Sequence, residues 1–144
     1  MRRNVTGQFE LPVTAAEAIG CFTPEGERTW VPGWDPIYPA GERTESPGTV
    51  FITADGDVET VWVIENIDRD AYVATYCRVT AGRHAGVVRV SCDDRPNDCC
   101  VVLVEYNMTT LRPDRPQVLD AYDDDAFFAM MNEWCARVTA ILNT

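Results

Sequence analysis

The C-terminal stretch of the chain, residues 116–142, carries the pattern that most limits the possible folds. Its large apolar residues recur at alternating steps of four and three, which places them along one stripe of an α-helix. Pro116 suits a first helical turn, and the aspartates near the start suit the positive end of the helix dipole. We therefore predict one long helix over 116–142, which needs a large apolar partner surface. The stripe consists of Phe127, Met131, Trp134, Val138 and Ile141, widened by Phe128, Met130, Cys135 and Leu142.

A series of short strands in the rest of the chain supplies that partner. Alternating apolar and polar residues predict a first strand that Pro12 ends. Later apolar runs are separated by turn sequences such as Asp55-Gly56, and consecutive strands with short turns form an antiparallel sheet. Such a sheet must cover its apolar face, and the C-terminal helix is the only element long enough to do so. The predicted strands are 3–11, 49–54, 58–67, 72–80, 85–92 and 99–111.

Two helix starts follow the first strand. The sequence Thr14-Ala15-Ala16-Glu17 has the spacing of a capping box, with Thr14 as the N-cap. Thr23 followed by Pro24 predicts a second short helix. Both helices are too short to cover the sheet alone.

An irregular loop is predicted for residues 30–48, which are rich in proline and glycine. The loop contains Trp30, Trp34 and Tyr38. Large aromatic residues in a loop usually pack over something apolar. These three either form a lid over a cavity or fill the core, and the sequence leaves both possibilities open.

Length and charge limit the class of protein. A chain of 144 residues is long enough for one domain, 1–144, with a sizeable core. The formal net charge is −11, from 23 acidic residues against 12 arginines and no lysine. Nucleic acids and anionic membranes require clustered basic side chains, so we expect neither as a partner. Without a secretory signal or an apolar run of about 18 residues, we expect a cytoplasmic protein.

Six cysteines and one histidine do not form a metal-binding pattern. The cysteines lie mostly inside apolar runs and are predicted to be free thiols in the core. Cys99 and Cys100 point to opposite faces of a strand, and no Cys-x-x-Cys pair occurs, so no metal is predicted. The run 123–125 lacks the spaced oxygens of a calcium loop and reads as a solvated helix start. No phosphate or dinucleotide motif is present, so no cofactor is predicted.

Several local motifs accompany this order of elements. They are residues 22–27, 30–36, 48–51, 61–64 and 104–106, together with Asp68 and Trp134. In these motifs the chain resembles the START/Bet v 1-like superfamily, also called the SRPBCC (polyketide cyclase/dehydrase and lipid transport) group. The resemblance implies an α+β helix-grip fold, in which a curved antiparallel sheet of six or seven strands wraps around the long C-terminal helix. Two short helices would follow the first strand, and a cavity would hold an apolar ligand.

Whether the cavity contains a charge depends on which face of the strand 72–80 points inward. Alternation places Tyr72, Tyr76 and Arg78 on one face. If this face points inward, Arg78 is a cation in an apolar cavity and needs an acidic partner from the protein or a ligand. The other face includes Val73 and Val79. Because arginine is seldom buried, we favour an outward Arg78.

His84 is the only histidine and follows a turn. A general base is most often histidine. A lone histidine at a strand end is more often a surface residue, so we favour an exposed position.

Three functions are compatible with the sequence, because members of the superfamily include ligand carriers, aromatic cyclases and chaperone-activating domains. The leading hypothesis is binding of a small apolar or aromatic molecule between the sheet and the C-terminal helix. An aromatase/cyclase-like enzyme would use Arg78 to stabilise an enolate and Tyr76 or His84 to move protons. A protein-interaction domain would instead expose an apolar patch. The predicted ligand-binding residues are Trp34, Trp62, Tyr76, Arg78, His84, Tyr106, Phe127, Met130 and Trp134.

Overall fold

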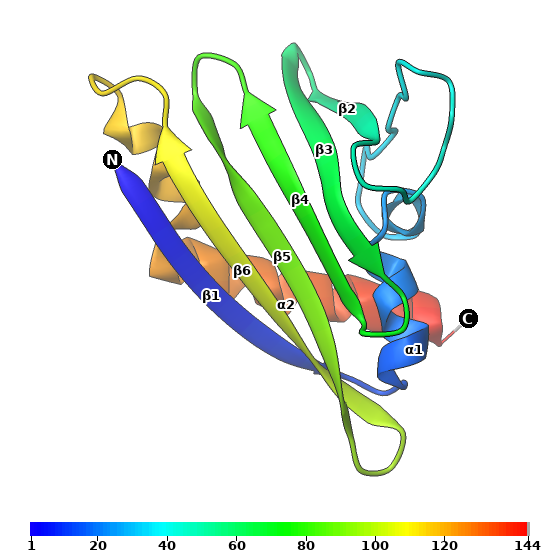
Figure 1. Cartoon of the computed structure of the whole chain (residues 1–144). Coiled ribbons are helices and arrows are strands. Elements are labelled where there is room, and N and C mark those ends of the chain that lie inside the picture. Colours follow the sequence, from blue (N-terminus) through cyan, green and yellow to red (C-terminus); the bar gives the residue numbers. More distant parts are fainter. Residues whose placement is uncertain (144) are drawn as a thin grey trace.

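The computed structural model describes residues 1–143 and contains one curved sheet of six antiparallel strands (Figure 1). The strands lie in the order β1-β6-β5-β4-β3-β2. Their bounds are β1 (Arg2–Leu11), β2 (Val50–Asp55), β3 (Val58–Asp68), β4 (Val73–Thr80), β5 (His84–Arg95) and β6 (Cys99–Thr110). Each predicted strand is present, and the ends differ by three residues at most.

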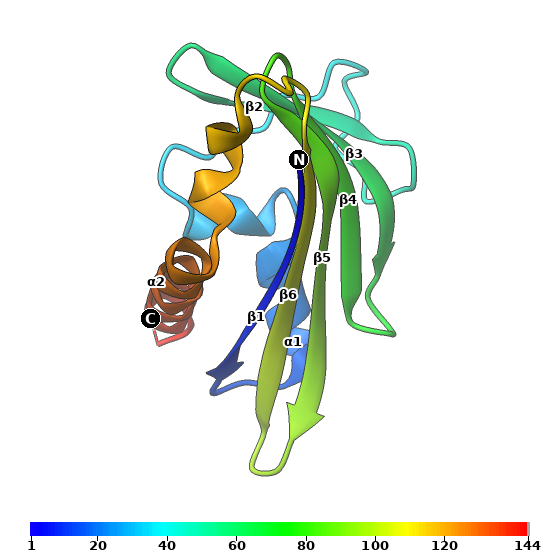
Figure 2. The ribbon, with the colours of Figure 1, turned by 90° about the vertical axis from the view of Figure 1, so that its left-hand side faces the viewer.

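All helices lie on one side of this sheet (Figure 2). The covered face is made by alternate residues of each strand. On β6 these are Cys100, Val102, Val104, Tyr106 and Met108, all buried, as the alternation predicted. The fold is therefore the predicted α+β helix-grip arrangement, with six strands.

The C-terminal helix is shorter than predicted. The α-helix α2 (Asp124–Leu142) is preceded by a separate 3₁₀-helix, η3 (Pro116–Tyr122). Between them, Asp123 has extended backbone angles (φ −68°, ψ 168°) and its side chain accepts a hydrogen bond from Ala126 N. An aspartate that caps a new helix ends the preceding one, so the continuous helix over 116–142 was a wrong prediction. The apolar stripe is also narrower than predicted, because Phe128 is 69% exposed.

Three short helices follow β1: α1 (Ala15–Ala18), η1 (Ile19–Phe22) and η2 (Gly26–Thr29). Thr14 is the N-cap as predicted, since Glu17 N donates to Thr14 Oγ1. The Glu17 carboxylate accepts from the Thr14 hydroxyl and not from the Thr14 backbone N–H of a full capping box. The helix η2 begins later than predicted, with Glu25 directly before its first residue. Thr23 still makes the hydrogen bonds of an N-cap, because its hydroxyl accepts from Gly26 N at 3.1 Å and its carbonyl accepts from Glu27 N at 3.0 Å.

An aromatic cluster joins α2 to the short helices and the following loop. The Trp134 ring lies 5.3 Å from Trp30 and 6.2 Å from Phe22, measured between ring centroids. Trp30 Nε1 donates to the carbonyl oxygen of Cys21 at 2.7 Å. Phe22 and Trp30 are buried, whereas Trp134 is half-buried. This cluster fixes α2 against η1 and the start of the loop.

Replacing Trp134 with alanine should therefore lower the free energy of unfolding by about 3 kcal/mol, the low end for a large aromatic residue, because the ring is half-buried. Urea denaturation measures this change. The matched control is Phe128→Ala on the exposed face of the same helix, which should change stability by less than about 0.5 kcal/mol. Equal effects of the two substitutions would show that Trp134 does not contribute to the core.

All six cysteines are free thiols, and Cys21, Cys92 and Cys100 are buried as predicted. The other three are half-buried rather than part of the core. No helix within residues 1–143 combines the length and the apolar character needed to span a membrane.

Candidate ligand-binding site

Cross-strand pairing brings the predicted polar residues into adjacent rows on the covered face of the sheet. One row runs from Trp62 through Arg78 and Gly86 to Met108. In the neighbouring row, Thr80 pairs with His84. The side chains of Arg78 and His84 therefore lie on the same face of the sheet, in rows that are two residues apart along the strands.

Arg78 points inward, contrary to the favoured interpretation of the sequence. Tyr76 on the same face of β4 is 4% exposed, whereas Val79 on the other face is 43% exposed. The two neighbours of Arg78 in its row explain why its side chain can lie inside. Gly86 has no side chain and leaves space, and Trp62 provides an aromatic ring for the guanidinium to contact. The guanidinium carbon lies 4.5 Å from the Trp62 ring centroid, a favourable cation–π contact.

The buried Nε of Arg78 has no hydrogen-bond partner within the described chain. The guanidinium also forms no ion pair within 4 Å there, whereas surface arginines such as Arg69 and Arg89 are paired with acids. Buried charges in proteins are normally paired. The guanidinium of the half-buried Arg78 interacts with the Tyr106 side chain, and its Nε–H remains an unused donor.

His84 is also inside, although the sequence favoured an exposed position. The residue is 7% exposed, and its ring packs edge-on against Tyr122 with centroids 5.6 Å apart. The buried Nδ1 has no hydrogen-bond partner among the described residues. Burial, assisted by the nearby charge of Arg78, lowers the pKa of His84 to about 4. The imidazole is thus neutral at neutral pH.

His84 should make stability depend on pH. Between its folded pKa of about 4 and the ordinary 6.5, the unfolded chain binds the additional proton, so stability falls as the pH drops through this window. The full difference corresponds to roughly 3 kcal/mol, and we expect about 1–2 kcal/mol because the imidazole borders an open cleft. Urea denaturation of wild type and His84→Gln at several pH values isolates this contribution. An identical loss of stability in both proteins on acidification would contradict it.

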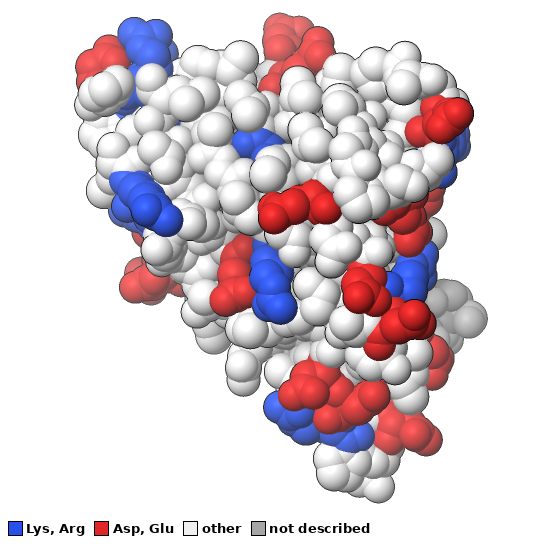
Figure 3. Space-filling view, viewed as in Figure 1, with Lys and Arg blue, Asp and Glu red and all other residues white. Residues whose placement is uncertain are grey.

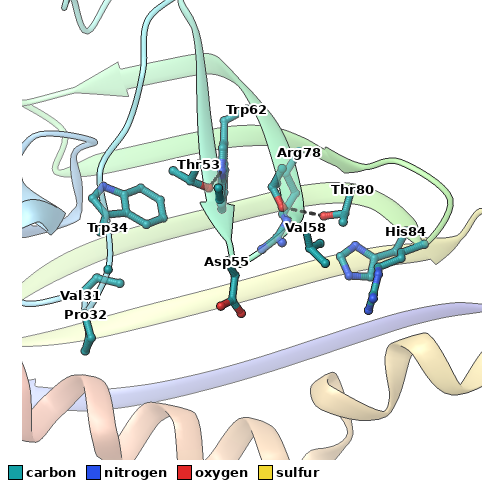
Figure 4. A pocket seen from close by; sticks show the side chains of 15 residues that line it. Val31, Pro32, Trp34, Thr53, Asp55, Val58, Trp62, Arg78, Thr80 and His84 are labelled. Carbon is teal, nitrogen blue, oxygen red and sulfur yellow. Dashed lines mark hydrogen bonds between the residues drawn. The ribbon is translucent and has the colours of Figure 1, made fainter.

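A cleft of about 630 Å³ opens beside these rows. Figure 4 shows Val31, Pro32 and Trp34 of the loop on one side, with Thr80 and His84 on the other. Trp62 and Arg78 lie between them, and Thr53 accepts a hydrogen bond from Trp62 Nε1 at 2.9 Å. The cleft therefore lies between the loop, the β2–β3 hairpin and the ends of β4 and β5.

A smaller chamber of about 120 Å³ lies deeper, towards the aromatic core. Val31, Trp34, Trp62 and Arg78 line both the chamber and the cleft. These four residues form the partition between the two spaces. The remaining walls of the chamber are Phe22, Glu27, Phe51, Tyr76, Val88, Val90, Tyr106 and Trp134.

Most of the predicted ligand-binding residues surround these two spaces. Trp34, Trp62, Tyr76, Arg78, Tyr106 and Trp134 line the chamber, and His84 lines the cleft. Phe127 and Met130 line neither space. Phe127 is instead buried against Tyr106, with ring centroids 5.4 Å apart. The helix α2 contributes only Trp134 to the walls, so the cavity lies mainly between the sheet and the loop.

The two tyrosines of the chamber are neutral phenols. Burial raises the pKa of both Tyr76 and Tyr106. The Tyr76 hydroxyl donates to the carbonyl oxygen of Phe22 at 2.7 Å. This bond ties β4 to the helix η1, which favours a positioning role for Tyr76 over proton transfer.

Glu27 is a member of the chamber wall that the sequence reasoning missed. It lies in η2, where a charged residue of a short helix is expected to face solvent. The residue is half-buried, and its side chain lines the chamber. Burial raises the pKa of this carboxyl well above its ordinary value, and the nearby charge of Arg78 offsets only part of the rise.

The opposite face of the sheet has a depression of about 410 Å³ over β1, β5 and β6, in which the arginine is already paired with an acid. On the face shown in Figure 3, basic side chains lie apart from one another and mostly near acidic ones. For example, Arg89 Nη1 lies 3.1 Å from Glu105 Oε2. Val61 and Val79 pair on neighbouring strands and are 39% and 43% exposed. These valines are the apolar feature that a protein-interaction domain would use.

Comparison with known proteins supports the fold. No protein-family model and no curated protein sequence matches the chain. Among solved structures, norcoclaurine synthase from Thalictrum flavum, in complex with dopamine and hydroxybenzaldehyde, superposes with a TM-score of 0.70 at 9% identity. That match covers 99% of this chain and 87% of the synthase. The protein Ara h 8.0201 matches with a TM-score of 0.65 at 16% identity, over 88% of this chain and 93% of that one.

A third similar structure is the di-domain ARO/CYC protein BexL of the BE-7585A biosynthetic pathway. It has a TM-score of 0.73 at 13% identity, and this chain spans 48% of its length. The chain therefore has the Bet v 1-like (START/SRPBCC) fold that its motifs predicted. Identities this low establish the fold alone.

Proposed function

We propose that this protein binds a small aromatic molecule that carries an anionic or strongly hydrogen-bond-accepting oxygen. The observation that carries the proposal is the unpartnered Nε of Arg78 at the junction of cleft and chamber. Arg78 is half-buried, and its enclosed Nε–H has lost contact with water without gaining an acceptor, which destabilises a fold. A ligand oxygen on Arg78 would supply the missing partner through a charge-assisted hydrogen bond.

The dimensions of the two spaces favour one ring in the chamber and a polar remainder in the cleft. An apolar cavity of roughly 150 Å³ is known to admit benzene, and the chamber of about 120 Å³ is close to that size. The cleft of about 630 Å³ falls within the usual range for small-molecule sites, roughly 300–1,000 Å³. The oxygen of such a ligand would lie at the partition, beside Arg78.

The aromatic walls favour a flat ring over an aliphatic chain. Phe51 and Trp62 stack with centroids 5.7 Å apart, and Tyr76 meets both edge-on. A ligand ring would extend this set of stacked and edge-to-face contacts. The synthase of similar fold is in complex with two small aromatic compounds, which supports the same ligand class here.

A titration with small aromatic acids and aldehydes tests the proposal. Isothermal titration calorimetry should show saturable binding of benzoate and hydroxybenzaldehyde, while cyclohexylamine, which is a cation without an aromatic ring, should not bind. Phe128→Ala, altered far from both spaces, should bind as wild type does. Native mass spectrometry of freshly purified protein would reveal a co-purifying molecule directly. Absence of binding for every aromatic compound would overturn the proposal.

A second candidate is an enzyme that abstracts a proton next to a carbonyl group. The observation in its favour is that Arg78 and His84 line the same cleft, each with a buried nitrogen that lacks a partner. A neutral imidazole can accept a proton while a guanidinium stabilises the enolate. NMR would detect deuterium exchange at the α-carbon of an aryl ketone, and His84→Gln should abolish it. No exchange above the buffer rate would leave binding as the only function.

A further inference from the structure

Glu27 is the only acidic residue among the described residues that line the chamber. No hydrogen bond or ion pair engages its side chain within residues 1–143. Its neighbours in the wall are mostly aromatic, and they include Trp34 and Trp134. A carboxylate in such surroundings loses its hydration without gaining hydrogen bonds, so its neutral form is favoured.

The charged and titratable groups that face Glu27 come from two strands. On β4 they are Arg78 and Tyr76, and on β6 the group is Tyr106. Both phenols are neutral, and Tyr76 already donates to a backbone carbonyl. The loop and α2 add Val31, Trp34 and Trp134, which do not titrate. Arg78 is therefore the only full charge that Glu27 meets in the chamber.

We infer that Glu27 determines the charge of the ligand that the chamber accepts. As a neutral carboxylic acid it leaves Arg78 as an uncompensated cation, which suits an anionic aromatic ligand. As a carboxylate it would neutralise Arg78 and make a neutral ligand the better partner. This inference rests on the proposed function, and it assigns Glu27 as the specificity-determining residue of that site.

The anion and a proton should consequently bind together. A ligand anion beside an ionised Glu27 would place two negative charges around one guanidinium in a poorly solvated space. Binding of the anion therefore favours the protonated form of Glu27. Above the pKa of Glu27, the affinity for an anion should fall by up to about tenfold per pH unit. The affinity for a neutral ligand of the same shape should not fall in this way.

Benzoate and benzamide are a suitable pair of probes, because they share a ring and differ in charge. Calorimetric titrations from about pH 5 to about pH 9 keep benzoate ionised and His84 neutral. In the wild type, the ratio of benzoate affinity to benzamide affinity should fall as the pH rises. In Glu27→Gln, an uncharged variant of the same shape, the ratio should stay constant and benzoate should still bind at high pH.

The outcomes separate the inference from the proposed function. If both probes bind and the ratio is independent of pH in the wild type, or changes equally in Glu27→Gln, the inference is overturned and the proposed function stands. If neither probe binds the wild type at millimolar concentration, the inference is overturned, and if hydroxybenzaldehyde does not bind either, the proposed function is overturned as well. A ¹³C NMR titration of the wild-type Glu27 carboxyl needs no variant. Its midpoint should lie well above the ordinary value of 4.5 and rise further with benzoate, and an ordinary midpoint would overturn the inference.

Discussion

Replacing Gly86 with alanine should lower the free energy of unfolding by more than about 4 kcal/mol, an exceptionally large effect for the addition of one methyl group. A Cβ atom at this position would collide with the backbone carbonyl oxygen of Asn107. It would also lie 2.6 Å from Met108 Sδ and 2.9 Å from Met108 Cα. Since the first obstacle is backbone, a rotamer change cannot relieve it, and β6 must shift away from β5.

Urea denaturation of Gly86→Ala measures this cost, and Gly20→Ala is the matched control. The added methyl group at Gly20 would meet only Arg69 Nη1, at 3.1 Å, which is the end of a flexible side chain. The control should change stability by less than about 1 kcal/mol. A similarly small change in Gly86→Ala would mean that β5 and β6 do not approach as closely as described. It would also remove the explanation for the space that Arg78 occupies.

Replacing Arg78 with methionine should weaken benzoate binding by roughly 10- to 100-fold and stabilise the free protein by about 1–3 kcal/mol. The loss follows from removing a charge-assisted hydrogen bond, worth about 1.5–3 kcal/mol. The gain follows because an apolar side chain replaces a half-buried cation whose enclosed Nε has no partner. Opposite changes in binding and stability distinguish a functional residue from a structural one.

Calorimetry and urea denaturation of Arg78→Met provide both readouts. The control is Arg83→Met, because Arg83 also lines the cleft but is exposed. It should change benzoate affinity by no more than about threefold, as expected for a solvated charge. Equal weakening by the two substitutions would show that the cleft attracts anions by its general charge and not through Arg78.

The fold was predictable because periodicity and turn chemistry act locally. Alternation on β6 determined which residues are buried there, and the predicted N-cap Thr14 identified the start of α1. The break at Asp123 was missed because the apolar stripe begins only at Phe127 and does not mark where the helix starts. At a cap, an aspartate side chain replaces the backbone hydrogen bond that would continue the helix, and the spacing of apolar residues carries no information about this replacement.

The candidate site was harder to predict because it depends on pairs of residues far apart in the sequence. Alternation alone gives two faces for β4 without showing which of them points inward. The inward face is determined by Trp62 and Gly86, which flank Arg78 in the sheet. Glu27 has no local pattern that marks it as part of a chamber. Its environment arises only when η2 is placed against β4 and β6, so only the structure could reveal it.

The most direct test of the account follows the Nε–H resonance of Arg78 by ¹⁵N NMR, assigned with Arg78→Met, while benzoate is added. If benzoate binds at Arg78, this proton should show a large downfield shift that saturates together with the calorimetric binding curve, because the free donor acquires a carboxylate acceptor. An Arg78 resonance that stays unchanged while benzoate saturates the protein would show that the ligand binds elsewhere, and the proposed site would be wrong.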